Sequence, residues 1–109
     1  MEKIYKKLIR DKVPQIMEAK GLIFETKILN EKEYQKALIE KLKEEMQELL
    51  DAKEDSFLEE MADVMEVLRA LLKMKGKTIL HLEEMRKEKY EKNGGFEKKI
   101  FLEKVKNAI

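Results

Sequence analysis

Four carboxylates on two consecutive segments have the types and spacing of a metal site. One pair lies within Glu44-Glu45-Met46-Gln47-Glu48, and the other, Glu-x-x-Asp, begins at position 60 after a gap of 11 residues. Residues three apart share a helix face, so each segment can offer two carboxylates to one side. Oxygen ligands without histidine or cysteine favour Mg²⁺ or Mn²⁺. The sequence therefore predicts a Mg²⁺ site, with Mn²⁺ as the alternative, and its expected ligands are Glu45, Glu48, Glu60 and Asp63.

The angular positions of the glutamates in the first segment separate ligands from ordinary surface charges. At 100° per residue, Glu45 lies about 60° from Leu42, at the border of an apolar stripe. Glu48 lies about 60° further round, whereas Glu44 points nearly opposite Leu42. Two of the three glutamates therefore belong to the edge of the core, and Glu44 is excluded as a ligand.

Glu60 lies inside the apolar band of the second segment, between the angular positions of Val64 and Val67. A buried carboxylate needs a partner, or its pKa rises until it is neutral. The alternative to a metal site is that Glu60 pairs with Lys41 or Arg69 and has no further role. Two facing pairs of carboxylates are harder to explain in that way, because they would repel one another unless a cation lay between them.

Two helices joined by a short polar turn are predicted to position these carboxylates. Asn30 begins the first helix with Glu33 as its capping-box partner, and residues 51–55 form the turn. A second capping-box pattern at residues 56–59 begins the next helix, which ends at Gly76. Such a short connection makes the helices antiparallel neighbours.

The rest of the chain is predicted to be mainly helical. A short helix spans residues 11–20, with Asp11 as its N-cap, and another runs from Thr78 to about Lys92. Alternating apolar residues suggest strands at 22–29 and 99–103, which could pair. The expected fold class is all-α, an antiparallel helix bundle with a minor two-stranded element, and all 109 residues form one domain.

Composition limits the kinds of molecule that this protein could bind and the setting in which we expect it. Lys and Arg number 24 against 23 Asp and Glu, so the basic excess typical of proteins that bind DNA or RNA duplexes is absent. The chain has no cysteine, which excludes disulfides and thiolate metal sites. No apolar run approaches the roughly 20 residues that span a bilayer, and no secretion signal is evident, so we expect a cytoplasmic protein. The wide apolar band at residues 57–72 predicts a homo-oligomer, either a dimer or a tetramer.

Three motifs in this order resemble a known family over nearly the whole chain. They are Leu8-Ile9-Arg10-Asp11-Lys12-Val13-Pro14, the Glu-Glu-x-x-Glu and Glu-x-x-Asp pair, and Gly94-Gly95-Phe96 followed by a basic-apolar segment. This combination is similar to the MazG-like, phosphoribosyl-ATP-pyrophosphohydrolase-like branch of the all-α nucleoside triphosphate pyrophosphohydrolases. The acidic motif alone is only moderately specific in a Glu-rich helical chain.

The resemblance implies Mg²⁺-dependent hydrolysis of a nucleoside triphosphate between the α and β phosphates, with the same four carboxylates as metal ligands. Either Glu45 or Glu48 would orient or deprotonate the attacking water. The developing phosphate charge needs cations, and the candidates are Arg10, Lys12, Lys41, Arg86 and Lys89. Two alternatives stay open: a phosphoribosyl-ATP pyrophosphohydrolase, and a non-catalytic helical interaction module whose carboxylates pair with lysines.

Overall fold

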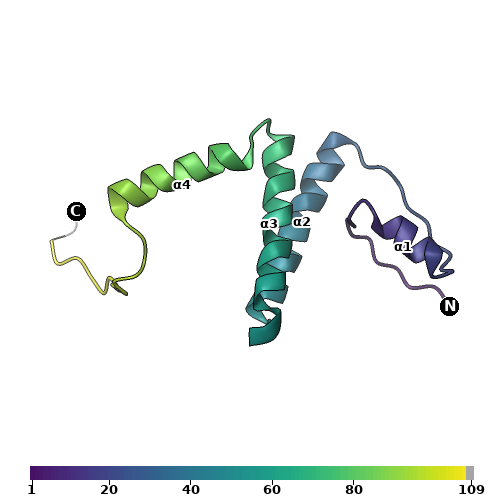
Figure 1. The fold of residues 1–109 in the computed structure, drawn as a ribbon, viewed down its shortest axis with the longest axis horizontal. Helices are drawn as coiled ribbons and strands as arrows, with labels where there is room; N and C mark the ends of the chain where they lie inside the picture. Colours follow the sequence, from purple (N-terminus) through teal and green to yellow (C-terminus); the bar gives the residue numbers. More distant parts are fainter. Residues whose placement is uncertain (108–109) are drawn as a thin grey trace. The chain divides into compact units, whose positions relative to one another are not determined.

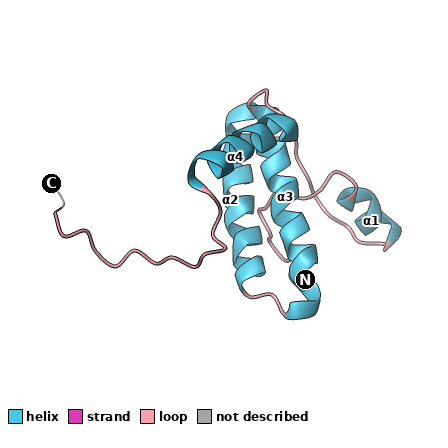
Figure 2. Ribbon diagram, turned by 60° about the vertical axis from the view of Figure 1, so that its left-hand side comes forward, coloured by secondary structure: helices cyan, strands magenta, loops and turns pink. Residues whose placement is uncertain are grey.

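Helices are the only regular elements between residues 1 and 107, the part of the chain that the computed structural model describes. They are α1 (Val13–Ala19), α2 (Glu31–Leu50), α3 (Phe57–Met74) and α4 (Ile79–Asn93), with a 3₁₀ turn η1 (Glu54–Ser56) before α3 (Figure 1). No strand occurs in the same residues, which confirms the all-α class (Figure 2). None of the helices in this part of the chain combines the length and apolar character needed to cross a bilayer.

The chain divides into two compact units. The first, Met1–Lys77, holds α1, α2 and α3, and the second begins at Thr78 and holds α4. In the second unit, Thr78 accepts a hydrogen bond from the backbone N–H of His81 and forms a capping box with it. The predicted start of this helix is therefore confirmed, and Gly94, with φ of 81°, follows its last residue.

The centre of the first unit is a hairpin of α2 and α3, which lie side by side (Figures 1 and 2). The predicted beginning of α2 at Asn30 is confirmed. The Asn30 side chain accepts from the Glu33 N–H at 2.9 Å, and the Glu33 carboxylate accepts from the Asn30 N–H at 3.2 Å. Among the described residues, the buried apolar side chains are those of Leu38 on α2 and Val67 on α3, exposed by 2% and 7%. So small a core places a large share of the stability on few side chains.

Apolar side chains also cover a second face of the hairpin. Leu58, Met61, Met65, Leu68 and Leu72 follow one another at spacings of three and four residues, the pattern of a helix–helix seam. Helical geometry places Met65 about 160° round α3 from Asp63. Eight large side chains on this apolar face are at least one-third exposed: Ile39, Met46, Leu50, Phe57, Leu58, Met61, Met65 and Leu68.

The predicted pair of strands is wrong. Residues 22–29 and 99–103 are both irregular, and Ile28 and Ile100 are almost fully exposed. Alternating sequence alone cannot hold a strand, because its backbone groups need a partner and a lone two-stranded pair is marginal unless it packs on helices. The two segments belong to different units.

The predicted Asp11 cap is wrong. Ser56 does stand at the N-cap of α3, as predicted, but its side chain makes no capping hydrogen bond there. Lys12 occupies the N-cap position of α1, and Pro14 in the first turn has no N–H for the carboxylate of Asp11 to cap. At α3, Ser56 has helical dihedral angles because it already belongs to η1. Its hydroxyl therefore donates back to the carbonyl of Lys53 at 3.2 Å.

We expect Leu38→Ala to lower the free energy of unfolding by about 3 kcal/mol, because it removes buried methyl groups and leaves a cavity in a very small core. Urea unfolding followed by circular dichroism measures the change. Ile23→Ala is the matched control, since Ile23 is fully exposed, and it should change the free energy by less than about 0.5 kcal/mol. Equal losses in the two variants would contradict the assignment of Leu38 to the core.

Candidate metal centre

The hairpin brings together the four carboxylates that the sequence singled out. Glu45 and Glu48 come from α2, Glu60 and Asp63 from α3, and one oxygen from each lies within 4.8 Å of the others. Oxygens on opposite sides of a Mg²⁺ ion are about 4.2 Å apart, so a small contraction would place these four around one ion. The cluster could therefore hold a metal ion.

Two of the carboxylates have buried oxygens that no group satisfies. The Glu45 side chain is only 10% exposed, and its Oε2 has no hydrogen-bond partner in the described part of the chain. The Oε2 atom of Glu60 is buried and unpartnered in the same way. Leaving a buried charged acceptor without a donor costs free energy. A cation held by the cluster would supply a positive partner for both carboxylates, which ordinary surface glutamates would not require.

Burial also changes the acidity of the same two groups. It raises the pKa of Glu45 above its ordinary 4.5, and the nearby Glu48 carboxylate raises it further, while the charge of Lys41 opposes the change. Burial likewise raises the pKa of Glu60, with smaller contributions from the charges of Asp63 and Glu45. In both groups burial disfavours the charged form, and a bound cation would favour it instead.

Two basic side chains reach the cluster. The ammonium of Lys41 lies 3.5 Å from Glu45 Oε1 and 3.3 Å from Glu44 Oε2. The guanidinium of Arg10, from the N-terminal segment, donates to Asp63 Oδ1 at 2.6 Å. The structure therefore places two of the five predicted phosphate-binding cations beside the carboxylates.

Glu44 lies apart from the cluster, as its angular position indicated. Its carboxylate pairs with Lys7 at 3.6 Å as well as with Lys41. The alternative partners suggested for Glu60 are not used: in residues 1–107, neither Lys41 nor Arg69 forms an ion pair with it. The explanation of Glu60 as one half of an ordinary salt bridge therefore loses its support.

The three remaining basic candidates belong to elements other than the hairpin. Lys12 is exposed at the N-cap of α1. Arg86 and Lys89 belong to α4 in the second unit. Arg86 donates through Nε and Nη2 to the Glu83 carboxylate at 2.6 to 3.0 Å. Its role in binding phosphate stays a prediction.

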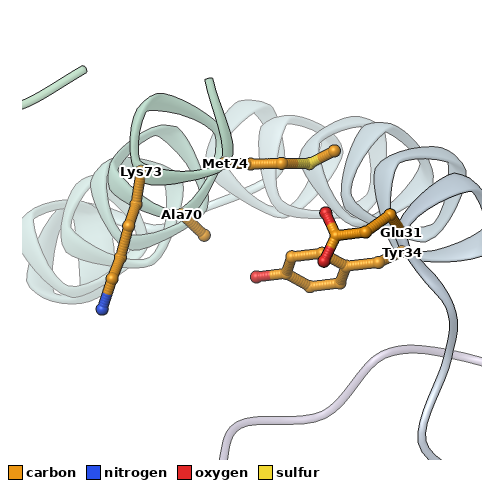
Figure 3. Close-up of a pocket in the computed structure, with 5 residues that line it drawn as sticks. All are labelled: Glu31, Tyr34, Ala70, Lys73 and Met74. Atoms are coloured by element: carbon orange, nitrogen blue, oxygen red, sulfur yellow. The ribbon is translucent and has the colours of Figure 1, made fainter. Parts of the chain in front are cut away.

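A hollow of about 430 Å³ lies at the other end of the hairpin, and sequence reasoning missed it (Figure 3). The Tyr34 ring and the Glu31 carboxylate reach it from α2, opposite Ala70, Met74 and Lys73 of α3. Tyr34 precedes Glu45 by 11 residues, which is close to three helical turns, so both lie on one face of α2. This 11-residue spacing from Glu45 is the sequence signal that could have pointed to Tyr34.

Comparison of the chain with known protein families, with curated proteins and with solved structures finds no match. The family resemblance drawn from the motifs therefore stays a prediction. What the geometry supplies by itself is a set of convergent carboxylate oxygens with two basic groups at its edge. Such a set suits a hard cation and, through that cation, an anionic ligand.

Glu60→Gln should raise the melting temperature of the metal-free protein at pH 8. Because the folded-state pKa of Glu60 is raised, the ionised group destabilises the fold. Its contribution is fully favourable below pH 4.5 and is lost as the pH rises through the folded-state pKa. The variant should therefore also show a weaker loss of stability with rising pH. Calorimetry in the presence of a chelator measures both effects.

The matched control for this prediction is Glu66→Gln, which removes the same charge from an exposed position on the same helix. It should leave the pH dependence of the melting temperature unchanged. If Glu60→Gln instead lowered the melting temperature at pH 8, the ionised carboxylate would be held by a favourable contact and the interpretation of the buried oxygen would be wrong.

Proposed function

We propose that this protein is a Mg²⁺-dependent nucleoside triphosphate pyrophosphohydrolase, which cleaves between the α and β phosphates and releases a monophosphate and pyrophosphate. The observation that carries the proposal is the convergence of four carboxylates with two buried, unpartnered oxygens, on Glu45 and Glu60. The flanking motifs that resemble the MazG-like branch support the choice of substrate. We propose a cytoplasmic setting, with clearance of non-standard nucleotides as the role.

Each side chain has a definite task in this proposal. The four carboxylates hold the ion, and Mg²⁺, or Mn²⁺ in its place, supplies charge neutralisation of the phosphates and a more acidic bound water. Glu45 or Glu48 orients or deprotonates the attacking water, and Glu48 is exposed, so solvent reaches it. Lys41 and Arg10 stand at the edge where phosphate charge develops.

The hollow beside Tyr34 is suited to the other end of a nucleotide. It lies on the same face of the hairpin as the carboxylates, because Ala70 follows Asp63 by seven residues, close to two helical turns. The separation along the helix is therefore about 10 Å or more, comparable to the span from base to phosphates in an extended nucleotide. The Tyr34 ring offers a surface for stacking, and Glu31 offers hydrogen-bond acceptors.

Two other functions are distinguishable from this one. A phosphoribosyl-ATP pyrophosphohydrolase would use the same carboxylates on a different nucleotide. A helical interaction module would use them only to pair with basic side chains, and the contacts of Lys41 with Glu45 and of Arg10 with Asp63 agree with that alternative. Glu60 argues against it, since its buried oxygen has no such partner in the described part of the chain.

Pyrophosphate release from a panel of nucleoside triphosphates should require Mg²⁺, and Glu60→Gln should abolish it while leaving the helical content intact. The reason is that the amide removes one negative ligand from a four-carboxylate site. The panel should include phosphoribosyl-ATP, and Glu66→Gln serves as the charge control. Full activity of Glu60→Gln would contradict its role as a ligand. No cleavage by the wild type, with no rise in melting temperature on adding Mg²⁺, would favour the interaction module.

We also propose that the apolar face of the hairpin joins copies of this chain into a dimer or tetramer. The eight large side chains of this face are about half exposed on average. Together they present an area on the order of 800 Å², which is what one partner contributes to a standard protein interface. The patch is larger than the 300–600 Å² that is usual on a soluble monomer. A second hairpin carries the same seam and would cover it.

Light scattering at micromolar concentration should therefore show a dimer or tetramer. Met65→Lys should shift the equilibrium towards the monomer, because the substitution places a charge in the middle of the seam. Ile23→Lys, at an exposed position outside the apolar face, should leave the mass unchanged. A monomeric wild type at this concentration would contradict the proposed interface.

A further inference from the structure

Arg10 forms an ion pair with one of the four carboxylates of the candidate metal site. Its Nη2 lies 2.6 Å from Asp63 Oδ1, although the two residues are 53 positions apart in the chain. Arg10 belongs to an irregular segment, since residues 1–10 form no helix or strand. The contact therefore joins a segment without regular backbone hydrogen bonds to a side chain fixed on α3.

The two cations at the cluster differ in how firmly they are held. Lys41 is 17% exposed, is anchored on α2 and lies between Glu44 and Glu45. Arg10 is 57% exposed, and within residues 1–107 its one ion pair is with Asp63, itself one-third exposed. Ion pairs at such exposure contribute little to stability. Arg10 can therefore leave its partner at low cost, whereas Lys41 stays in place.

A divalent cation bound to Asp63 would repel the guanidinium that now contacts the same carboxylate. Once released, Arg10 would stand at the rim of the site with its planar set of N–H donors free. That geometry matches the oxygens of a phosphate, which arginine binds through two parallel hydrogen bonds.

We infer that Arg10 is an exchangeable counter-ion of the site: it neutralises Asp63 in the metal-free protein and transfers to a phosphate of the nucleotide when the ion binds. This inference rests on the proposed function and adds the order of events at the site. It also separates Arg10 from a residue that merely orients a ligand, because an orienting arginine would strengthen metal binding and an exchangeable one competes with it.

Isothermal titration with Mn²⁺ alone, at physiological ionic strength, tests the first half of the exchange. Arg10→Gln should bind Mn²⁺ about threefold more tightly than the wild type, since an exposed ion pair no longer competes. Arg69→Gln is the matched control: it removes the same charge from an exposed position on α3 that forms no ion pair in residues 1–107. Its Mn²⁺ affinity should change less than twofold, because solvent and salt screen that charge.

Titration of the Mg²⁺-loaded protein with the non-hydrolysable α,β-methylene analogue of ATP tests the second half. Arg10→Gln should bind this analogue about tenfold more weakly than the wild type, and Arg69→Gln should bind it as the wild type does. Unchanged or weaker Mn²⁺ binding by Arg10→Gln would overturn the exchange, and so would unchanged affinity for the analogue. If the wild type bound no divalent cation, the proposed function itself would fail, and that result is recognisable before any variant is compared.

Discussion

Mutual repulsion among four carboxylates is the constraint on which the rest of this structure depends. The hairpin holds Glu45 and Glu60 where water cannot solvate all their oxygens. Burial raises the pKa values of these two carboxylates, and Lys41 and Arg10 bring positive charge beside the cluster. The two basic side chains balance part of the negative charge of the cluster, and a bound ion would balance more of it.

Much of the hairpin could be predicted because its signals are local. The capping box of Asn30 and Glu33 is a contact over three residues, and both partners are visible in the sequence. The failures arose where local patterns need a distant partner or a particular backbone. The strand at residues 22–29 had no second strand to pair with. Ser56 lost its cap because η1 had already fixed its dihedral angles as helical.

In the candidate site, too, local patterns were predictable and contacts between distant segments were not. Helical periodicity was enough to select Glu45, Glu48, Glu60 and Asp63 and to exclude Glu44, since only rotation about two helix axes was required. The contact of Arg10 with Asp63 could not be read in that way, because nothing in the sequence states where an irregular segment will lie against a helix 53 residues later. The hollow beside Tyr34 was missed because it exists only between two helix ends.

All four carboxylates fall between residues 45 and 63, on either side of the turn at η1. The site is therefore low in contact order: it needs only the closure of a short loop and no pairing of distant segments. During synthesis, these residues leave the ribosome before α4 does, so the acidic cluster can form while the C-terminal part of the chain is still being made. An ion captured at that point would cross-link the two helices of the nascent hairpin, and metal supply would then influence the yield of folded protein.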